Sequence, residues 1–580
     1  MDTFPSNTAS LNLFIILMLL AGISTFYKFN LHSSLIRYLD NQILFSIFKA
    51  VTIYSIISFL ISSMLIPSIV PRSVALINWA LVLIFSTAAR FFIGFLLNFF
   101  SGEKRRKRIL IYGTNQSSIE MLSALKNLNN YQIIGLIDDN IELIGARIRG
   151  IKVFSINKIE GLVENSKVEE ILVSSKGITS EKKLTLLDKL DKFPIGVKLV
   201  PSFQEFVAGG IFSDNIKNID VHDLLGRKIV RPDTNLLKKN IHNKVVCITG
   251  GGGSIGSELC RQVIKHKPKL LLIVDISELA IYEIDKELKA LNGTNIDYKP
   301  ILGDSGDIGF MSSLLEKYHI STIYHTAAYK HVPMVENNIS QGVKNNFIGT
   351  INLALLCIKQ NLETFVFIST DKAVRPTNVM GATKRLSEIA IMSLAKEAKS
   401  TNFAIVRFGN VLNSSGSVIP LFKEQINSGG PVTVTDKDVI RYFMTISEAV
   451  ELVIQAGAMT KCNDLFILDM GEPVRIDDLA KKMIKLSGHT LKSHINPSGD
   501  IEIKYTGLRT GEKLYEELLI EDNSAETEHP LIFKASESLH NIFDVREMIS
   551  QLNELVKDND EELLLSKLQE FVPEYKPNRF

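Results

Sequence analysis

The sequence lacks the features of a disulfide-bonded, metal-binding or nucleic-acid-binding protein. Its 580 residues include four scattered cysteines and no CxxC pair (Cys247, Cys260, Cys357 and Cys462). This spacing argues against a disulfide framework and a zinc site, so we expect no metal, and it fits a reducing compartment. The 65 basic and 63 acidic residues nearly cancel, and no basic stripe is interleaved with aromatic residues. We therefore expect no nucleic-acid partner.

Charge is absent from long stretches of the first hundred residues. Three segments of 17 residues contain no charged side chain (Leu11–Tyr27, Ala50–Ile66 and Ser73–Ala89). Flanking apolar residues bring each segment close to the roughly 20 needed to span a bilayer as a helix. The sequence therefore predicts a membrane anchor of about three transmembrane helices in residues 1–107. We disfavour a cleaved signal peptide for the first segment, because it lacks a positive region before it and carries Asp2.

Basic residues flank the predicted spans and indicate their orientation. Lys28, Arg37 and Lys49 lie between the first and second spans, and the run 104–108 (KRRKR) follows the third. Two spans separate these clusters, so both lie on the same side of the membrane. Because basic residues favour the cytoplasmic face, we expect the large C-terminal part in the cytoplasm. Arg90, directly after the third span, is expected to snorkel to the interface.

Short apolar runs alternate with amphipathic stretches after the basic run. Strands and helices are predicted at Arg108–Tyr112, Ser118–Leu128, Gln132–Asp138, Glu170–Ser174, Glu181–Leu190 and Val197–Val200. This βαβ pattern predicts a small Rossmann-like domain at 108–205. Its first turn, 113–117 (GTNQS), lacks the later glycines of a phosphate-binding fingerprint, so ligand binding and a spacer or assembly role both stay open. A connector is expected at 206–243 and a second αβ domain at 244–580.

A glycine-rich turn opens the second αβ domain. The apolar run 244–249 (KVVCIT) leads into 250–256 (GGGGSIG), and a helical pattern follows. Gly250 allows the tight turn, Gly253 lets the backbone approach a pyrophosphate, and Gly256 permits close packing of helix on sheet. Asp275 ends the next predicted strand, where its carboxylate can bind a ribose hydroxyl and repel a 2′-phosphate. We therefore expect NAD rather than NADP.

The Gly-x-x-Gly-x-x-Gly spacing resembles the extended branch of the short-chain dehydrogenase/reductases, and two later segments agree with it. Gly303-Asp304 follows the third predicted strand, near the expected adenine position. Residues 325–328 (HTAA) end the fourth strand, where small side chains let the backbone pass close to the cofactor. The expected cofactor contacts are Gly250, Gly253, Ser254, Ile255, Gly256, Asp275, Asp304, Ala327, Ala328 and Lys384.

Polar residues follow the buried strand predicted at 364–368. The strand ends in 369–372 (STDK), and ligands bind at the carboxyl ends of strands in open αβ sheets. Met380 and Lys384 come next, four positions apart on one face of a predicted helix. Most short-chain dehydrogenases carry tyrosine and lysine there, with the tyrosine as proton acceptor. Methionine cannot exchange a proton, so the usual base is missing from its usual position.

Together these motifs resemble the large membrane-bound nucleotide-sugar 4,6-dehydratases of bacterial polysaccharide and glycan synthesis. The similar segments are 331–333 (HVP), 370–372 (TDK), 380–384 (MGATK), 407–411 (RFGNV), 441–445 (RYFMT) and 507–513 (GLRTGEK). The resemblance covers nearly the whole chain. It implies transmembrane helices in the bacterial inner membrane followed by two α/β Rossmann-like domains. The second is a doubly wound parallel sheet with a smaller C-terminal substrate-binding region. Two departures are the three predicted spans, where four are usual, and the glycine-poor turn at 113–117.

The resemblance also implies the partners and the reaction. The substrate would be a UDP-sugar, UDP-N-acetylglucosamine, and the protein a homo-oligomer at the lipid bilayer. A hydride leaves C4 of the sugar for NAD, the resulting ketone acidifies the C5 proton, water leaves from C6, and the hydride returns to C6. Asp371 would be the acid at O6 and Lys372 the base at C5, with burial lowering the pKa of the lysine. Thr370 would bind the C4 hydroxyl, and Lys384 the nicotinamide ribose. The expected substrate contacts are Lys330, His331, Asn410, Arg441 and Arg509, with both arginines at the diphosphate.

Other interpretations of these residues stay open. A nucleotide-sugar 4-epimerase shares fold, cofactor and substrate class, but it needs a proton acceptor at C4, normally the tyrosine that Met380 replaces. A non-catalytic membrane scaffold or dinucleotide sensor would need no acid–base pair at the end of the fifth strand. His331 could be a structural loop residue, and Asp371 and Lys372 could form a solvated loop pair.

Overall fold

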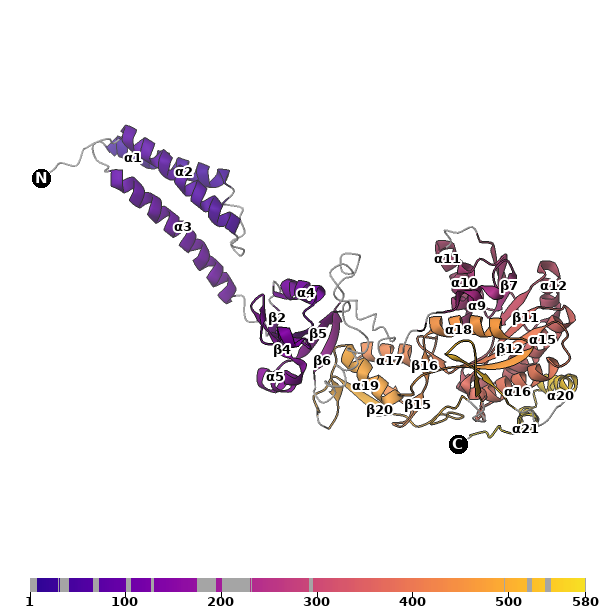
Figure 1. Ribbon diagram of the computed structural model, residues 1–580. Helices are drawn as coiled ribbons and strands as arrows, with labels where there is room; N and C mark the ends of the chain where they lie inside the picture. Colours follow the sequence, from indigo (N-terminus) through magenta and orange to yellow (C-terminus); the bar gives the residue numbers. More distant parts are fainter. Residues whose placement is uncertain are drawn as a thin grey trace. The chain divides into compact units, whose positions relative to one another are not determined.

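The chain divides into two compact units, Met1–Arg106 and Lys107–Phe580 (Figure 1). The computed structural model describes residues 8–29, 31, 41–65, 72–100, 106–126, 130–174, 195–200, 230, 232–291, 296–494, 496–518, 524–537 and 544–578. The predicted helix at 181–190 and most of the predicted connector lie outside these ranges.

The first unit contains helices at all three places where spans were predicted. They are α1 (Thr8–Lys28), α2 (Asn41–Leu65) and α3 (Arg72–Phe100). By length and composition, the latter two can cross a membrane, through segments of 21 residues at Leu44–Met64 and Ser73–Ile93. The apolar stretch of α1, Asn12–Lys28, is shorter.

Two charged residues lie elsewhere than predicted. Lys49 was expected in the connection before the second span, but it lies inside α2, where its Nζ is 4.7 Å from the ring centroid of Phe45. Arg90 was expected after the third span, but it lies inside α3 and donates a hydrogen bond of 2.7 Å to the carbonyl oxygen of Leu31. Both predictions were wrong because the helices extend beyond the charge-free runs. Each cation is compensated locally, by an aromatic ring or a carbonyl oxygen.

The second unit begins with a six-stranded sheet of order β3-β4-β2-β1-β5-β6. Its strands are β1 (Lys107–Tyr112), β2 (Tyr131–Asp138), β3 (Arg147–Ile148), β4 (Ile151–Ser155), β5 (Glu170–Ser174) and β6 (Gly196–Val200). The four predicted strands are confirmed. The hairpin β3–β4 was not predicted, because two-residue β3 is too short to show a period. Apart from antiparallel β3, the order reproduces the 3-2-1-4-5 winding of a Rossmann-type sheet.

A nine-stranded sheet forms the centre of the larger domain, in the order β21-β22-β17-β12-β11-β10-β7-β8-β9. The strands are β7 (Val245–Thr249), β8 (Leu270–Asp275), β9 (Tyr298–Leu302), β10 (Thr322–His325), β11 (Thr364–Ile368), β12 (Asn402–Arg407), β17 (Asn463–Leu468), β21 (Ser524–Glu526) and β22 (Ile532–Ala535). From β9 to β17 all pairs are parallel, and antiparallel β22 and β21 close one edge. This is the predicted doubly wound sheet. Its strand order reverses between β7 and β10, where ligands bind beyond the strand ends.

Helices cover both faces of this sheet. One face packs against α12 (Ile308–Tyr318), α15 (Thr350–Lys359), α16 (Val379–Leu394), α20 (Val545–Asp558) and α21 (Glu561–Phe571). The other packs against α9 (Thr234–Lys239), α10 (Ser254–Lys265), α11 (Glu278–Leu291) and α18 (Ile446–Met459). Because both faces are buried, the central strands are continuous apolar runs without alternation. Helix α9 falls in the predicted connector, yet its Leu237 is buried in this core.

Short strands build a smaller region beyond β12. They pair as β13 (Asn410–Val411) with β16 (Phe443–Met444), β15 (Ile440–Arg441) with β18 (Val474–Arg475), and β14 (Val432–Val434) with β20 (Ile501–Tyr505) and β19 (Leu491–Lys492). Two helices, α17 (Val418–Asn427) and α19 (Ile476–Leu486), bury their apolar faces against them. This region carries the end of the 407–411 motif and the 441–445 and 507–513 motifs. Asn410 Oδ1 accepts a hydrogen bond of 3.3 Å from Lys372, just beyond the carboxyl end of β11.

Candidate active site

The glycine turn connects β7 to α10 as predicted, and its backbone leaves no room for side chains. Gly250 has a φ of +68°, and a Cβ there would lie 2.7 Å from the amide nitrogen of Ala327. A Cβ at Gly256 would lie 2.0 Å from the carbonyl oxygen of Gly250. Both contacts are with backbone, which cannot move aside. The tight turn brings the N-terminus of α10 to the strand ends, the usual place for a pyrophosphate.

Asp275 is tied to the same turn. Its Oδ2 accepts a hydrogen bond of 2.9 Å from the amide of Gly252, and its Oδ1 accepts one of 2.9 Å from the amide of Ser277. The carboxylate therefore lies at the end of β8, beside the glycine turn, as the sequence spacing predicts. Asp304 lies after β9, where its Oδ1 accepts a hydrogen bond of 2.8 Å from the amide of Gly306.

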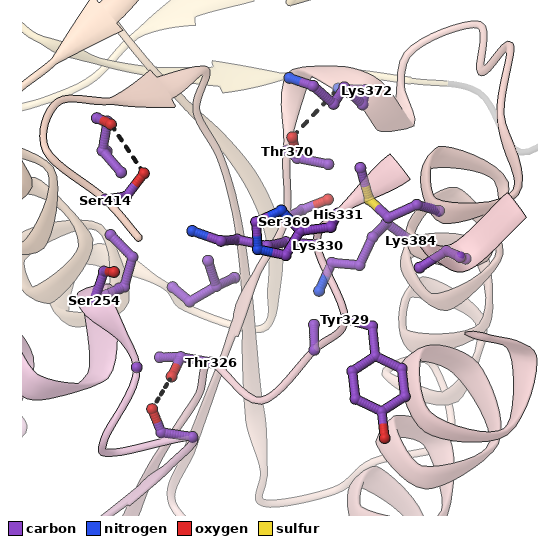
Figure 2. A pocket seen from close by; sticks show the side chains of 18 of the residues that line it. Ser254, Thr326, Tyr329, Lys330, His331, Ser369, Thr370, Lys372, Lys384 and Ser414 are labelled. Carbon is purple, nitrogen blue, oxygen red and sulfur yellow. Dashed lines mark hydrogen bonds between the residues drawn. The ribbon is translucent and has the colours of Figure 1, made fainter. Parts of the chain in front are cut away.

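A cavity of about 690 Å³ lies at the carboxyl ends of the central strands, large enough for a small-molecule ligand (Figure 2). The predicted residues that line it are Gly250, Gly253, Ser254, Ile255, Gly256, Ala328, Lys330, His331, Thr370, Lys372, Met380, Lys384 and Asn410. Asp275, Asp304, Ala327 and Asp371 are outside this described lining. The structure thus brings the glycine turn, the end of β11 and the start of α16 to one cavity.

The end of β11 places Thr370, Asp371 and Lys372 in one hydrogen-bonded group. Thr370 Oγ1 donates to Asp371 Oδ1 at 2.8 Å, and Lys372 Nζ donates to the same oxygen at 2.9 Å. Asp371 is fully buried, and its Oδ2 has no hydrogen-bond partner among the described residues. Thr370 and Lys372 line the cavity, so they connect the buried carboxylate to it. The interpretation as a solvated loop pair does not fit this burial.

A second carboxylate, which the motif pattern did not indicate, faces Lys372. Glu516 Oε1 lies 3.8 Å from Lys372 Nζ, and the Glu516 side chain is 4% exposed. Burial by itself lowers the pKa of Lys372, but the charges of Asp371 and Glu516 outweigh it and raise that pKa overall. The expectation that burial lowers the pKa of Lys372 is therefore wrong. Lys372 and Glu516 lie far apart in the sequence and meet only in the folded chain. A sequence motif therefore does not show this pair.

Helix α16 carries the pair that differs from most short-chain dehydrogenases. Its N-cap, Asn378, accepts a hydrogen bond of 2.8 Å from the amide of Gly381, which fixes where the helix begins. Met380 and Lys384 both line the cavity, as expected for one helix face. Lys384 Nζ lies 3.9 Å from the ring centroid of Phe367. Burial lowers the pKa of Lys384 to about 7.

The expected substrate contacts divide between two cavities. Lys330, His331 and Asn410 line the larger one, and burial lowers the pKa values of Lys330 and His331. Arg441 and Arg509 line a second cavity of about 150 Å³, which Lys372 and Glu516 also line. Lys372 therefore borders both.

The two arginines differ in their hydrogen-bond partners and in their exposure. Arg441 donates to the carbonyl oxygens of Ile440, Lys513 and Leu514 and to Glu512 Oε1, at 2.7 to 3.2 Å. A phosphate contact would require this buried guanidinium to exchange protein acceptors. Arg509 is exposed at the small cavity.

A buried ionic cluster, which includes Glu388, Arg407 and Glu537, lies next to the end of β11. Glu388 in α16 accepts from Arg407 Nε at 2.7 Å and Nη2 at 2.6 Å, and from Ser369 Oγ at 2.6 Å. Arg407 also donates to Glu537 at 2.5 Å. The arginine of the 407–411 motif thus ties α16 to β11, β12 and the segment after β22.

Comparison with known proteins agrees with this architecture. Residues 246–537 match a family described as polysaccharide biosynthesis protein, and residues 105–188 match one described as C2185-like, N-terminal. The capsular polysaccharide biosynthesis protein CapD of Staphylococcus aureus is 38% identical over 500 residues, which cover 85% of this chain and 82% of CapD. The probable polysaccharide biosynthesis protein EpsC of Bacillus subtilis is 43% identical over 419 residues, 71% of this chain and 68% of EpsC. The UDP-glucose 4-epimerase of Rickettsia canadensis is 32% identical and matches 49% of this chain and 80% of the epimerase. This chain therefore belongs to the polysaccharide biosynthesis protein family.

Proposed function

We propose that this protein is a membrane-anchored, NAD-dependent 4,6-dehydratase of a UDP-sugar. The proposed substrate is UDP-N-acetylglucosamine, and the product is a UDP-4-keto-6-deoxy-N-acetylhexosamine for surface polysaccharide or glycan synthesis. The observation that carries this proposal is the contact between Asp371 and Lys372 at the cavity end of β11. It provides an acid and a base side by side, which dehydration needs. Family membership supports the substrate class.

The glycine turn and the acidic residue beside it support a nicotinamide dinucleotide as the cofactor. Gly250 and Gly256 leave the turn without side chains, so the backbone can approach a pyrophosphate at the start of α10. Asp275 would hold the adenosine ribose, which favours NAD over a 2′-phosphorylated cofactor. Lys384 would hold the nicotinamide ribose. When bound, NAD would supply the hydride acceptor for C4 of the sugar and the hydride donor for C6.

The side chains at the end of β11 move the protons. Thr370 lies between the cavity and Asp371, so its hydroxyl can pass the C4 hydroxyl proton to Oδ1, 2.8 Å away. The protonated Asp371 then gives this proton, through the Thr370 hydroxyl that lines the cavity, to O6 as the C6–O6 bond breaks and water leaves. Lys372 takes the C5 proton in that step and returns it to C5 after the hydride has reached C6. The proton that Lys372 carries at rest must leave before it can act as the base.

Product analysis tests the proposal. The purified full chain in detergent is incubated with UDP-N-acetylglucosamine and NAD in D₂O, and the product is examined by NMR. We expect a 4-keto-6-deoxy sugar with deuterium at C5. Lys372→Ala should lower turnover by about 10²–10⁴-fold, the usual contribution of a general base. Near-normal turnover and C5 deuteration in that variant would show that Lys372 is not the base.

A UDP-sugar 4-epimerase is the second candidate, since the rickettsial relative bears that name. An epimerase returns the hydride to C4 and leaves O6 in place, so its product is a stereoisomer of the substrate. Epimerisation needs no acid and base at C5 and C6, so the contact between Asp371 and Lys372 disfavours this function. The same NMR spectrum separates the two products. A protein that binds NAD but converts no UDP-sugar would instead be a sensor or scaffold.

The remaining assignments complete this proposal. Residues 1–107 form the multi-pass anchor, 108–205 the small Rossmann-like domain, 206–243 the connector and 244–580 the catalytic domain. The enzyme works as a homo-oligomer at the cytoplasmic face of the bacterial inner membrane. Lys330, His331 and Arg509 are its exposed candidates for substrate contacts.

A further inference from the structure

Lys372 carries a proton that the proposed dehydration requires it to lose. Asp371, its nearest acceptor, is needed as the acid at O6 and receives its own proton through Thr370. A second acceptor is therefore required within reach of Lys372 Nζ. Among the residues that the structure describes, the side chains that face this nitrogen are Asp371, Asn410, Glu516 and Arg441. Of these, Glu516 is the second group that can accept a proton.

We propose that Glu516 stores the resting proton of Lys372 while the lysine acts as the base. This inference rests on the proposed dehydratase function and adds a member to its acid–base group. Glu516 acts through Lys372, so it is a positioning residue. Its Oε1 lies 3.8 Å from Lys372 Nζ, and a shift of about 1 Å would bring the two atoms within hydrogen-bond distance.

The surroundings of Glu516 suit a group that changes protonation state. Its Oε2 is buried and has no hydrogen-bond partner among the described residues, which leaves a site for a proton. The charged groups that face it are Lys372, Asp371, Arg441 and Lys513. Burial raises the pKa of Glu516, and the charge of Asp371 adds to this rise, while the three cations oppose it. The pKa is raised overall, which favours the stored proton.

The protons balance over one turnover. At rest Lys372 is an ammonium, and Asp371 and Glu516 are carboxylates. As C4 is oxidised, the C4 hydroxyl proton reaches Asp371 through Thr370, and the ammonium proton passes to Glu516. Elimination then moves the C5 proton to Lys372 and the Asp371 proton to O6. Lys372 returns its proton to C5, and Glu516 gives the stored proton back, which restores the resting state.

The segment that carries Glu516 is anchored at the reacting end of β11. Lys513 Nζ donates to the carbonyl oxygen of Val374 at 2.8 Å, just beyond the catalytic turn. Arg441 holds the backbone of Lys513 and Leu514, and its Nε lies 3.8 Å from Glu516 Oε1. Arg441 thus holds the segment that places Glu516 beside Lys372.

The test compares Glu516→Gln with Glu516→Asp and the control Glu517→Gln in the full chain. Glu517 is the neighbouring carboxylate, which pairs with Arg375 and is 43% exposed. Labelling of Lys372 with acetic anhydride, followed across pH by mass spectrometry, reports its pKa without any substrate. We expect a fall of roughly 1 to 3 pH units in Glu516→Gln, the shift typical of losing an opposite charge at this distance. The two other variants should keep the wild-type value to within a few tenths.

Kinetics give the second readout. With UDP-N-acetylglucosamine, Glu516→Gln should lose about 10²-fold or more in kcat at little change in KM, since a proton-transfer partner is removed. Absorbance at 340 nm should show NADH accumulating, because C4 oxidation continues while elimination stalls. Glu516→Asp should recover part of the rate. An unchanged Lys372 pKa, or normal kcat, in Glu516→Gln would overturn the proposal. A wild-type protein that forms no dehydrated product would overturn the dehydratase function instead, whatever the labelling shows.

Discussion

Lys372 and Lys384 line the same cavity, but their surroundings shift their pKa values in opposite directions. Lys372 faces two carboxylates, which raise its pKa despite burial. Lys384 lies over the ring of Phe367, and burial lowers its pKa to about 7. The two lysines therefore hold different charges near neutral pH: Lys372 is an ammonium at rest, and Lys384 is close to its titration midpoint.

The lowered pKa of Lys384 predicts a pH dependence of stability. In the unfolded chain a lysine titrates near 10.5, so between about pH 7 and 10.5 the unfolded state binds more protons. The folded state therefore loses stability as pH falls through this range, and the cost stays constant below about 7. Lys384→Met removes this cost. Its melting temperature without NAD should exceed that of the wild type most at pH 6, and the difference should shrink toward pH 10.

A surface variant provides the comparison for Lys384. Lys289 is 70% exposed and pairs with Asp285, so Lys289→Met should change the melting temperature little at any pH between 6 and 10. A rise in the melting temperature of Lys384→Met that does not vary with pH would mean that the pKa of Lys384 in the folded state is close to that of a free lysine. A lower melting temperature at every pH would mean that the contact of Lys384 with Phe367 stabilises the fold by more than the burial of its charge costs.

At the residue scale, the sequence predicted the groups that lie near one another along the chain. Thr370, Asp371 and Lys372 follow one buried strand, and Met380 and Lys384 share one helix face, so local periodicity places them together. Glu516 comes from a distant segment and joins them only through tertiary packing. The pKa of Lys372 was predicted in the wrong direction for the same reason.

At the scale of elements, the buried ionic cluster predicts a large effect of a single substitution. Arg407 is fully buried and donates to Glu388 and Glu537. Arg407→Met would leave Glu388 and Glu537 to share Arg385, which pairs with them at 3.1 and 2.7 Å. Removing one partner from a buried ionic group costs about 3–5 kcal/mol. We expect a clear fall in melting temperature of the purified chain and loss of activity, because α16 and the end of β11 share this cluster.

Two further variants define what the Arg407 result means. Arg475 pairs with Asp438 at the surface, where both side chains are at least 44% exposed, so Arg475→Met should change stability by less than about 1 kcal/mol. Glu388→Met combined with Arg407→Met removes one carboxylate together with the cation, leaves Glu537 paired with Arg385, and should recover part of the loss. If the double variant is no more stable than Arg407→Met, lost packing rather than excess buried negative charge causes the effect.

Elements were predictable where a strand or helix is long enough to show its period. The strands β7, β8 and β11 appear in the sequence as apolar runs because both faces of the sheet are covered. Pairs such as β13 with β16 or β15 with β18 contain only two residues a strand, so no periodicity marks them. Yet these pairs hold Asn410 and Arg441 beside the catalytic turn, and the site depends on them.

At the scale of the whole molecule, the doubly wound order followed from alternation of strands and helices, whereas the predicted membrane anchor allows two arrangements. Helices α2 and α3 each have a segment of 21 residues that can cross a bilayer, and the apolar stretch of α1 is shorter. With three spans the N-terminus and the catalytic domain lie on opposite sides. With two spans, formed by α2 and α3, they lie on the same side.

Reporter fusions at three places distinguish these arrangements. Fusions after Asn41 and after Lys107 should both report the cytoplasm, because α2 and α3 together return the chain to the side where basic residues concentrate. A tag before Thr8 should lie outside if α1 spans the membrane, and inside if α1 lies along the surface. Opposite locations for Asn41 and Lys107 would contradict both arrangements. The tag before Thr8 therefore decides the number of spans, while the pair of fusions decides whether the active site faces the cytoplasmic pool of nucleotide sugars.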